Sequence, residues 1–151
     1  MSSEPSGSIV SDTGPLLEMA TGSGLGAYIK GLIGSNTIRA YTNELNIGEL
    51  RYVLCRKIGE VQSEKAVNKL VDSGYLTIST FAEFINHAAR MKCARSLAFP
   101  DCFALSMGES MTIPVLFASH EAELLKEIKK RPFKTTVLFL EDYMSKSQRS
   151  H

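Results

Sequence analysis

The stretch Ser8-Ile9-Val10-Ser11-Asp12-Thr13-Gly14-Pro15-Leu16-Leu17 decides the fold prediction. Its β-branched pair favours a strand, and the Thr-Gly-Pro run that follows stops this strand and allows a helix to begin at Leu16. Asp12 therefore stands at the carboxyl end of a strand. In open α/β sheets ligands bind at that edge, so Asp12 is a candidate site residue. The alternative interpretation is that Asp12 only caps the following helix.

The length and composition predict one globular domain. A chain of 151 residues that is 44% hydrophobic and 22% charged can bury a single core. The domain is expected to cover 8–144, with flexible ends at 1–7 and 145–151. No apolar run reaches the roughly 20 residues of a membrane span, and residues 1–7 lack the pattern of a secretory signal. We therefore expect a cytoplasmic protein without a membrane partner.

The cysteines and the net charge carry little functional signal. Cys55, Cys93 and Cys102 are odd in number and lack metal-type spacing, so we expect buried, reduced thiols. The formal net charge of +1 does not indicate a generally basic surface for nucleic acid. Basic residues do cluster locally, which favours solvated helix faces over a phosphate track. These clusters are Arg51, Arg56 and Lys57; Arg90, Lys92 and Arg95; and Lys126, Lys129, Lys130 and Arg131.

Short apolar strands alternate with helical periodicity along the whole chain. This alternation predicts an α/β fold: a three-layer α/β/α sandwich around a parallel sheet of four to five strands, with right-handed crossovers. Strands are predicted at 9–10, 37–42, 75–78, 112–118 and 136–140. Helices are predicted at 16–33 with a break at 21–24, at 47–58 with Asn46 as N-cap, at 63–72, at 81–95, from Cys102 onward, and through 123–128.

Three acids share one topological position in this scheme. Asp12, Glu49 and Asp101 each stand where a strand or loop passes into a helix, and a parallel sheet gathers such positions at one edge. Carboxylates held together repel and raise one another's pKa, so the arrangement favours a bound divalent cation. Hard oxygen ligands indicate Mg²⁺ or Mn²⁺ rather than zinc. Such ions activate water against phosphodiesters, which makes hydrolysis of a nucleic-acid backbone the natural chemistry.

Four motifs in order also carry a family resemblance. Ser11-Asp12-Thr13-Gly14-Pro15-Leu16, Leu45-Asn46-Ile47-Gly48-Glu49-Leu50, Phe99-Pro100-Asp101-Cys102-Phe103-Ala104-Leu105 and Pro114-Val115-Leu116-Phe117-Ala118 resemble those of the PIN-domain ribonucleases, especially the VapC-type toxins of prokaryotic toxin–antitoxin pairs. The resemblance implies Mg²⁺- or Mn²⁺-dependent endonuclease activity on RNA, homodimers, and inhibition by an antitoxin peptide. It also places Asp12, Glu49 and Asp101 on the three most regular metal-site acids.

The fourth acidic position departs from that family's pattern. Many members carry Thr-x-Asp after the fourth strand, whereas this chain reads Ala118-Ser119-His120-Glu121-Ala122-Glu123, with His120 where the aspartate would fall. Glu121 is the candidate to substitute as a catalytic helper. Thr13, Ser119 and His120 are candidates to contact phosphate or to support the site, and ordinary capping or loop roles remain open for them. Asn43 and Glu44, near Glu49, either support the site from behind or are exposed loop residues, and the second interpretation is favoured.

Two functions follow from these residues. The leading hypothesis is a metal-dependent endoribonuclease, a toxin of a toxin–antitoxin system, in which Asp12, Glu49 and Asp101 hold the ion. The alternative is a PIN-like nucleic-acid-binding or regulatory protein with weak or lost nuclease activity. A receiver-type phosphorylation domain does not fit, because Ser11 and not a second acid precedes Asp12. The apolar helices around 25–33 and 84–91 are either an interface for a second copy or an antitoxin, or buried core.

Overall fold

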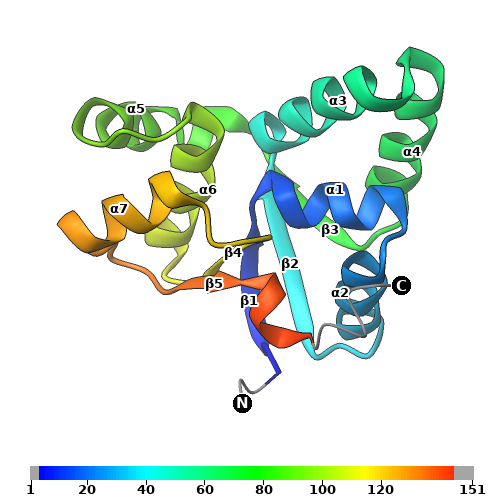
Figure 1. Ribbon diagram of the computed structural model, residues 1–151, viewed down its shortest axis with the longest axis horizontal. Coiled ribbons are helices and arrows are strands. Elements are labelled where there is room, and N and C mark those ends of the chain that lie inside the picture. Colours follow the sequence, from blue (N-terminus) through cyan, green and yellow to red (C-terminus); the bar gives the residue numbers. More distant parts are fainter. Residues whose placement is uncertain (1–3, 145–151) are drawn as a thin grey trace.

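The strands form one five-stranded parallel sheet in the order β3-β2-β1-β4-β5 (Figure 1). This is a computed structural model that describes residues 4–144, so the predicted tail 145–151 and residues 1–3 lie outside the described residues. The predicted flexible N-terminus, 1–7, overlaps the first strand. The strands are β1 (Gly7–Ser11), β2 (Ile38–Asn43), β3 (Leu76–Ser79), β4 (Val115–Phe117) and β5 (Val137–Phe139).

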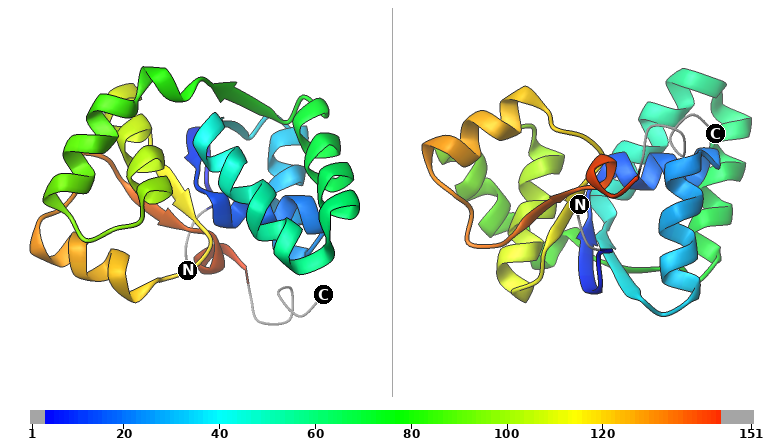
Figure 2. Two further views of the ribbon diagram at one scale, coloured as in Figure 1. Left: turned by 90° about the horizontal axis from the view of Figure 1, so that it is seen from above. Right: turned by 60° about the horizontal axis from the view of Figure 1, so that its bottom comes forward.

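Helices cover both faces of this sheet, which confirms the predicted three-layer sandwich. Helices α1 to α4 lie on one side and α5 to α7 on the other (Figure 2). The chain steps outward from β1 to β3 and then returns past β1 to β4, and right-handed crossovers place the helices on opposite faces when the direction reverses. The helices are α1 (Thr13–Thr21), α2 (Gly24–Gly34), α3 (Glu44–Ile58), α4 (Glu60–Asp72), α5 (Ile85–Ala94), α6 (Phe99–Met111) and α7 (Ala122–Lys130), with 3₁₀ turns η1 (Phe81–Glu83) and η2 (Leu140–Tyr143).

The helices around 25–33 and 84–91 were predicted to form either an interface or buried core. In the structure their apolar side chains belong to the core. Ile29 and Leu32 of α2 are buried in the cluster under α1 to α4, and Ala88 and Met91 of α5 are buried in the cluster under α6 and α7. These side chains are therefore unavailable to a partner. The large exposed apolar side chains of α3 and α4 are instead Tyr52, Ile58 and Val61.

Several element boundaries differ from the prediction. Helix α1 begins at Thr13 rather than Leu16, because Pro15 lies in the first turn, where helical N–H groups have no intrahelical partner. The predicted 81–95 helix is split into η1 and α5 at Phe84. The predicted fourth strand is shorter at its start, because Thr112 adopts a left-handed φ of 58° and ends α6.

Helix α3 begins at Glu44, and its N-cap is Asn43 rather than Asn46. The Asn43 side chain accepts a hydrogen bond from the backbone N–H of Asn46 at 3.0 Å. Asn43 is fully buried, so the interpretation of this residue as an exposed loop residue is wrong, whereas Glu44 is exposed. Glu49 consequently lies in the second turn of the helix and not in the first.

Two further sequence predictions can be compared with the structure. Within residues 4–144, no helix combines the length and apolar character that crossing a membrane requires. All three cysteines are free, as expected, but they are not all buried: Cys102 is buried, Cys55 is intermediate and Cys93 is exposed.

Candidate metal centre

Asp12 leaves β1 at the point where the order of the strands reverses. Its backbone N–H donates to the carbonyl oxygen of Leu116 in β4 at 2.9 Å, which ties it to the neighbouring strand. It occupies the N-cap position of α1, yet its side chain makes no capping hydrogen bond to that helix. A Cβ at Gly14 would lie 2.8 Å from the Cβ of Ala118, so only glycine lets α1 start this close to the end of β4.

Four acids from separate segments approach one another at this edge. Asp12 follows β1, Glu49 lies on α3, and Asp101 lies in the first turn of α6. Glu121 immediately precedes α7 at its N-cap position and is exposed. The charge of Glu49 acts on both aspartates, and that of Glu121 acts on Asp101. The structure thus places the predicted acids within electrostatic range of one another, although among the described residues 4–144 the acidic group whose ligand atoms all lie within 4.8 Å is His120, Glu141 and Asp142.

The two aspartates are electrostatically unfavourable as a pair of charges. Burial raises the pKa of Asp12 well above its usual range, and the charges of Asp101 and Glu49 add to this, although the nearby backbone N–H groups of Thr13 and Gly14, which form no full capping hydrogen bond, partly oppose it. Burial, followed by the charges of Glu121 and Glu49, raises the pKa of Asp101 to about 7, against an opposing hydrogen bond with Asp12. A bound cation would remove this penalty.

A buried asparagine joins three of the segments that carry the site. The side-chain amide of Asn46 donates to the Pro100 carbonyl oxygen at 3.2 Å, to Thr13 Oγ1 at 3.1 Å and more weakly to Asp12 Oδ1 at 3.4 Å. Its own Oδ1 accepts from Asn43 Nδ2 at 2.7 Å, which fixes the orientation of the amide. Asn46 therefore connects the start of α1 to the start of α6, and so Asp12 to Asp101.

The sequence prediction missed this role because it treated Asn46 as a helix cap. The signal was present in the Asn43-x-x-Asn46 spacing, which matches an N-cap residue paired with the residue at the third helical position. This pairing places Asn46 inside the first turn of α3 and turns its side chain toward the sheet edge. A capping residue at 46 would instead have begun the helix too late for Glu49 to lie in its second turn.

The three predicted supporting residues lie in different surroundings. The Thr13 hydroxyl is buried and donates to the Asn46 carbonyl oxygen at 3.5 Å, so it is engaged within the protein. Ser119 is partly exposed, and its backbone carbonyl accepts from the N–H of Glu121 at 3.0 Å. Both residues therefore help to hold neighbouring segments in place.

His120 is directed to the C-terminal turn η2. One ring nitrogen contacts Glu141, and Nε2 lies 3.2 Å from Asp142 Oδ2. The ring also stacks on Phe139, with centroids 4.0 Å apart. His120 therefore fixes the β4–α7 connection against the end of the described chain, and its ring nitrogens are already engaged there.

A cleft of about 660 Å³ opens beside Asp101 and Glu121. Its other wall is the last turn of α5, which includes Lys92, and the connection to α6, which includes Arg95. The exposed Lys92 side chain donates to the Leu97 carbonyl oxygen at 2.6 Å. Asp12 does not line this cleft, since it is only 5% exposed. Asp101 is thus the aspartate that faces the cleft.

The donor chemistry fits a hard divalent cation. Carboxylate oxygens from Asp12, Glu49 and Asp101 are the ligands that Mg²⁺ and Mn²⁺ prefer, and the cleft leaves room for waters that such ions retain. Two of the three groups are buried enough to disfavour their charged forms when no cation is present. The fold is thus an α/β/α sandwich that carries acidic side chains at its sheet edge.

The chain belongs to the PIN domain family, whose model matches residues 9–130. The match includes all four acids of the cluster. No curated protein sequence gives a significant match. The fold is also that of VapC-type proteins, as solved structures with low sequence identity show.

Three solved structures illustrate this shared fold. VapBC2 from Rickettsia felis, bound to a DNA fragment from its promoter, superimposes with a TM-score of 0.63 at 12% identity, covering 86% of this chain and 96% of that one. Mycobacterium tuberculosis VapC20, a toxin that cleaves the sarcin-ricin loop, gives 0.61 at 17% identity, with coverage of 78% and 94%. FitAcB from Neisseria gonorrhoeae gives 0.51 at 12% identity, with coverage of 88% and 98%.

Proposed function

We propose that this protein is a metal-dependent endoribonuclease that hydrolyses RNA phosphodiester bonds. The observation that carries the proposal is the gathering of Asp12, Glu49 and Asp101 at one sheet edge, with two of the carboxyls held at raised pKa. Membership of the PIN domain family supports it, as does the shared fold with a toxin that cleaves the sarcin-ricin loop.

Each residue of this site would have a separate role. Asp12, Glu49 and Asp101 hold Mg²⁺ or Mn²⁺, and Asn46 keeps the first and third of these in register. When bound, the ion supplies a Lewis acid that polarises the phosphate and lowers the pKa of water. Glu121 stands exposed at the cleft, where it can accept a proton from an attacking water.

The test is cleavage of a structured RNA in Mn²⁺ and in EDTA. Wild type should cut the RNA only with metal, and the Asp12→Asn and Asp101→Asn variants should cut no faster than the EDTA control. The Glu123→Gln variant is the matched control, because Glu123 also lines the cleft but does not act on the pKa of either aspartate. Equal cleavage by wild type and Asp12→Asn would overturn the proposal.

The regulatory alternative makes a different prediction in the same experiment. It is favoured by the position of His120, which engages Glu141 and Asp142 at the place where the family pattern has an acid. A protein of that kind would bind the RNA without cutting it in Mn²⁺. Binding without cleavage by wild type would therefore replace the enzyme by a binding module.

We further propose that the chain is a toxin, forms a homodimer and is held inactive by an antitoxin. The support is the likeness to VapBC2 and the exposed apolar side chains of α3 and α4, where Tyr52 is 48%, Ile58 47% and Val61 64% exposed. Tyr52 lies next to the site, since its hydroxyl is 3.5 Å from Glu49 Oε2. A partner on this surface would reach the metal centre.

Expression without a partner should arrest growth of a bacterial host, and Asp12→Asn should relieve the arrest. Light scattering on the purified chain measures the homodimer directly. A monomeric mass would overturn the homodimer. Unaffected growth with soluble wild-type protein would overturn the toxin assignment.

A further inference from the structure

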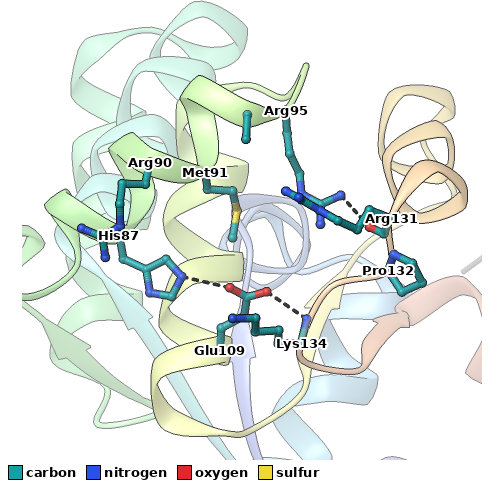
Figure 3. A pocket seen from close by; sticks show the side chains of 9 residues that line it. His87, Arg90, Met91, Arg95, Glu109, Arg131, Pro132 and Lys134 are labelled. Atoms are coloured by element: carbon teal, nitrogen blue, oxygen red, sulfur yellow. Dashed lines mark hydrogen bonds and ion pairs between the residues drawn. The ribbon is translucent and has the colours of Figure 1, made fainter.

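A second cleft, of about 590 Å³, lies on the α5 to α7 side of the molecule and is rich in cationic side chains (Figure 3). It is bounded by α5, the end of α6 and the connection between α7 and β5. In Figure 3, His87 and Arg90 stand on one side, Arg95 and Arg131 on the other, and Glu109 between them. Lys134 completes this basic cleft.

The one acid among the lining residues is already engaged. Glu109 Oε1 is 2.9 Å from His87 Nε2, and Glu109 Oε2 accepts from the backbone N–H of Lys134 at 2.9 Å. Within residues 4–144, no carboxylate lies within ion-pair distance of the Arg90, Arg131 or Lys134 side chains. The cleft therefore holds three cations with no counter-ion, on a chain whose formal net charge is only +1.

Arg95 gives the cleft a fixed wall. Its side chain is 7% exposed, and its guanidinium lies 3.8 Å from the centroid of the Phe133 ring. Its Nη1 donates to the carbonyl oxygens of Glu127 at 3.0 Å and Arg131 at 2.6 Å. This ties the end of α7 to the end of α5 and so fixes the backbone of Arg131. The cleft is a built feature of the fold.

The basic cleft adjoins the cleft beside the candidate metal centre. Ala94 and Arg95 line both this cleft and the one that contains Asp101 and Glu121. A strand of polyanion that enters the acidic cleft beside the α5–α6 connection can therefore continue past Arg95 toward Arg90 and Arg131. Cations without partners next to a carboxylate site are what a strand carrying successive phosphates requires.

We propose that the basic cleft binds the phosphate backbone of the RNA substrate at a phosphate other than the one being cleaved. This rests on the proposed ribonuclease function and identifies where the strand runs. Arg90 and Arg131 contact phosphate, Lys134 adds charge, and Arg95 orients the wall. The cleft positions the strand without reading its sequence, because phosphate contacts carry no base information.

The test compares Arg90→Ala/Arg131→Ala with Lys57→Ala/Lys65→Ala, a control that removes the same charge from exposed positions on the opposite layer. Binding of a mixed-sequence 12-nucleotide single-stranded RNA is measured in EDTA against salt concentration. Losing two phosphate contacts should lower the salt slope by about 1.4 and weaken binding about tenfold at 0.15 M salt. In Mn²⁺, KM should rise by a similar factor while kcat stays constant.

Several outcomes separate this inference from the function on which it rests. If the arginine variant binds RNA more weakly without metal and wild type does not cleave RNA, the proposed role of the basic cleft stands and the proposed nuclease activity is wrong. Cleavage by wild type with equal salt slope and KM in both double variants would overturn the cleft. Unchanged RNA binding, with loss of binding to a 12-residue polyglutamate peptide, would assign the cleft to an acidic protein and also overturn the proposal. Thermal melting confirms that each double variant folds.

Discussion

The raised pKa of Asp101 makes the stability of the metal-free protein depend on pH. Its carboxyl has a pKa of about 7 in the folded chain, against 3.8 for an unperturbed aspartate, because of burial and the charges of Glu121 and Glu49. The folded state therefore holds a proton that the unfolded state releases. Stability from this group is complete below pH 4 and is lost as the pH rises through about 7.

The metal-free protein should therefore be less stable at pH 8 than at pH 5. Between pH 5 and pH 8 the upper limit of the effect is about 2.7 kcal/mol, because about two pH units separate pH 5 from the folded pKa, and the exposed part of Asp101 reduces it through solvent screening. Urea unfolding in EDTA at the two pH values measures the difference. Asp101→Asn should flatten the dependence, and an unchanged profile in that variant would mean that another group is responsible.

Asn46→Ala tests the connection between the two aspartates. Removing the amide leaves the Pro100 carbonyl oxygen without this donor and should cost about 1–3 kcal/mol of unfolding free energy. Metal affinity should fall about 10- to 100-fold, since supporting hydrogen bonds orient the ligands. Calorimetric Mn²⁺ titration measures the affinity, with the exposed Asn86→Ala as control. If Asn46→Ala binds Mn²⁺ as tightly as wild type does, the Asn46 amide has only a structural role.

For individual residues, the sequence predicts which acids lie at the site, but it does not predict which side chains orient them. Asp12 and Asp101 could be predicted because each stands at a junction between an apolar element and a helix start, which is visible in one dimension. The role of Asn46 depends on the Pro100 carbonyl oxygen, a backbone atom far away in the chain, and no side-chain pattern records it. The position of His120 likewise depends on η2, which has little apolar periodicity.

Among the elements, α2 is held against α1 by a close backbone contact. A Cβ at Gly26 would lie 2.0 Å from the carbonyl oxygen of Glu18, whereas a Cβ at Gly31 of the same helix would meet nothing within 4 Å. The two glycines therefore have opposite roles in one element. Gly26 allows the helices to pack, and Gly31 only adds freedom to the unfolded chain.

Gly26→Ala and Gly31→Ala should consequently shift stability in opposite directions. Gly26→Ala should lower the free energy of unfolding by about 1–3 kcal/mol, because a backbone segment has to move to make room for the new Cβ. Gly31→Ala should stabilise by about 0.5–1 kcal/mol, the usual gain in a helix interior. Urea midpoints of the two variants against wild type provide the measurement. Equal effects of the same sign would contradict the packing described for α1 and α2.

Element type could be predicted from periodicity, and element ends could not. The alternation of strands and helices can be predicted from the spacing of apolar residues in the sequence, and the structure confirms it. The start of α3 depends on a choice between Asn43 and Asn46, both good capping residues, and is decided by which side chain the core can bury. The split falls at Phe84, which ends the 3₁₀ turn η1 and is buried in the core cluster that includes α5 to α7.

For the molecule as a whole, metal binding and folding should be coupled. An ion that binds only the folded state stabilises it by about 2.7 kcal/mol when its concentration is 100 times Kd. Mn²⁺ should therefore raise Tm, and more at pH 8 than at pH 5, where Asp101 holds its proton. Differential scanning fluorimetry measures both shifts. The same shift in Asp12→Asn would place the ion elsewhere.

The strand order has a further consequence, for the protein during its own synthesis. The central strand β1 is made first, yet its neighbour β4, at Val115–Phe117, is among the last elements to be made. The four acids span positions 12 to 121, so a growing chain cannot assemble the cluster until Glu121 has emerged from the ribosome. If the protein cuts RNA, this delay keeps each new molecule harmless to the ribosome that is making it.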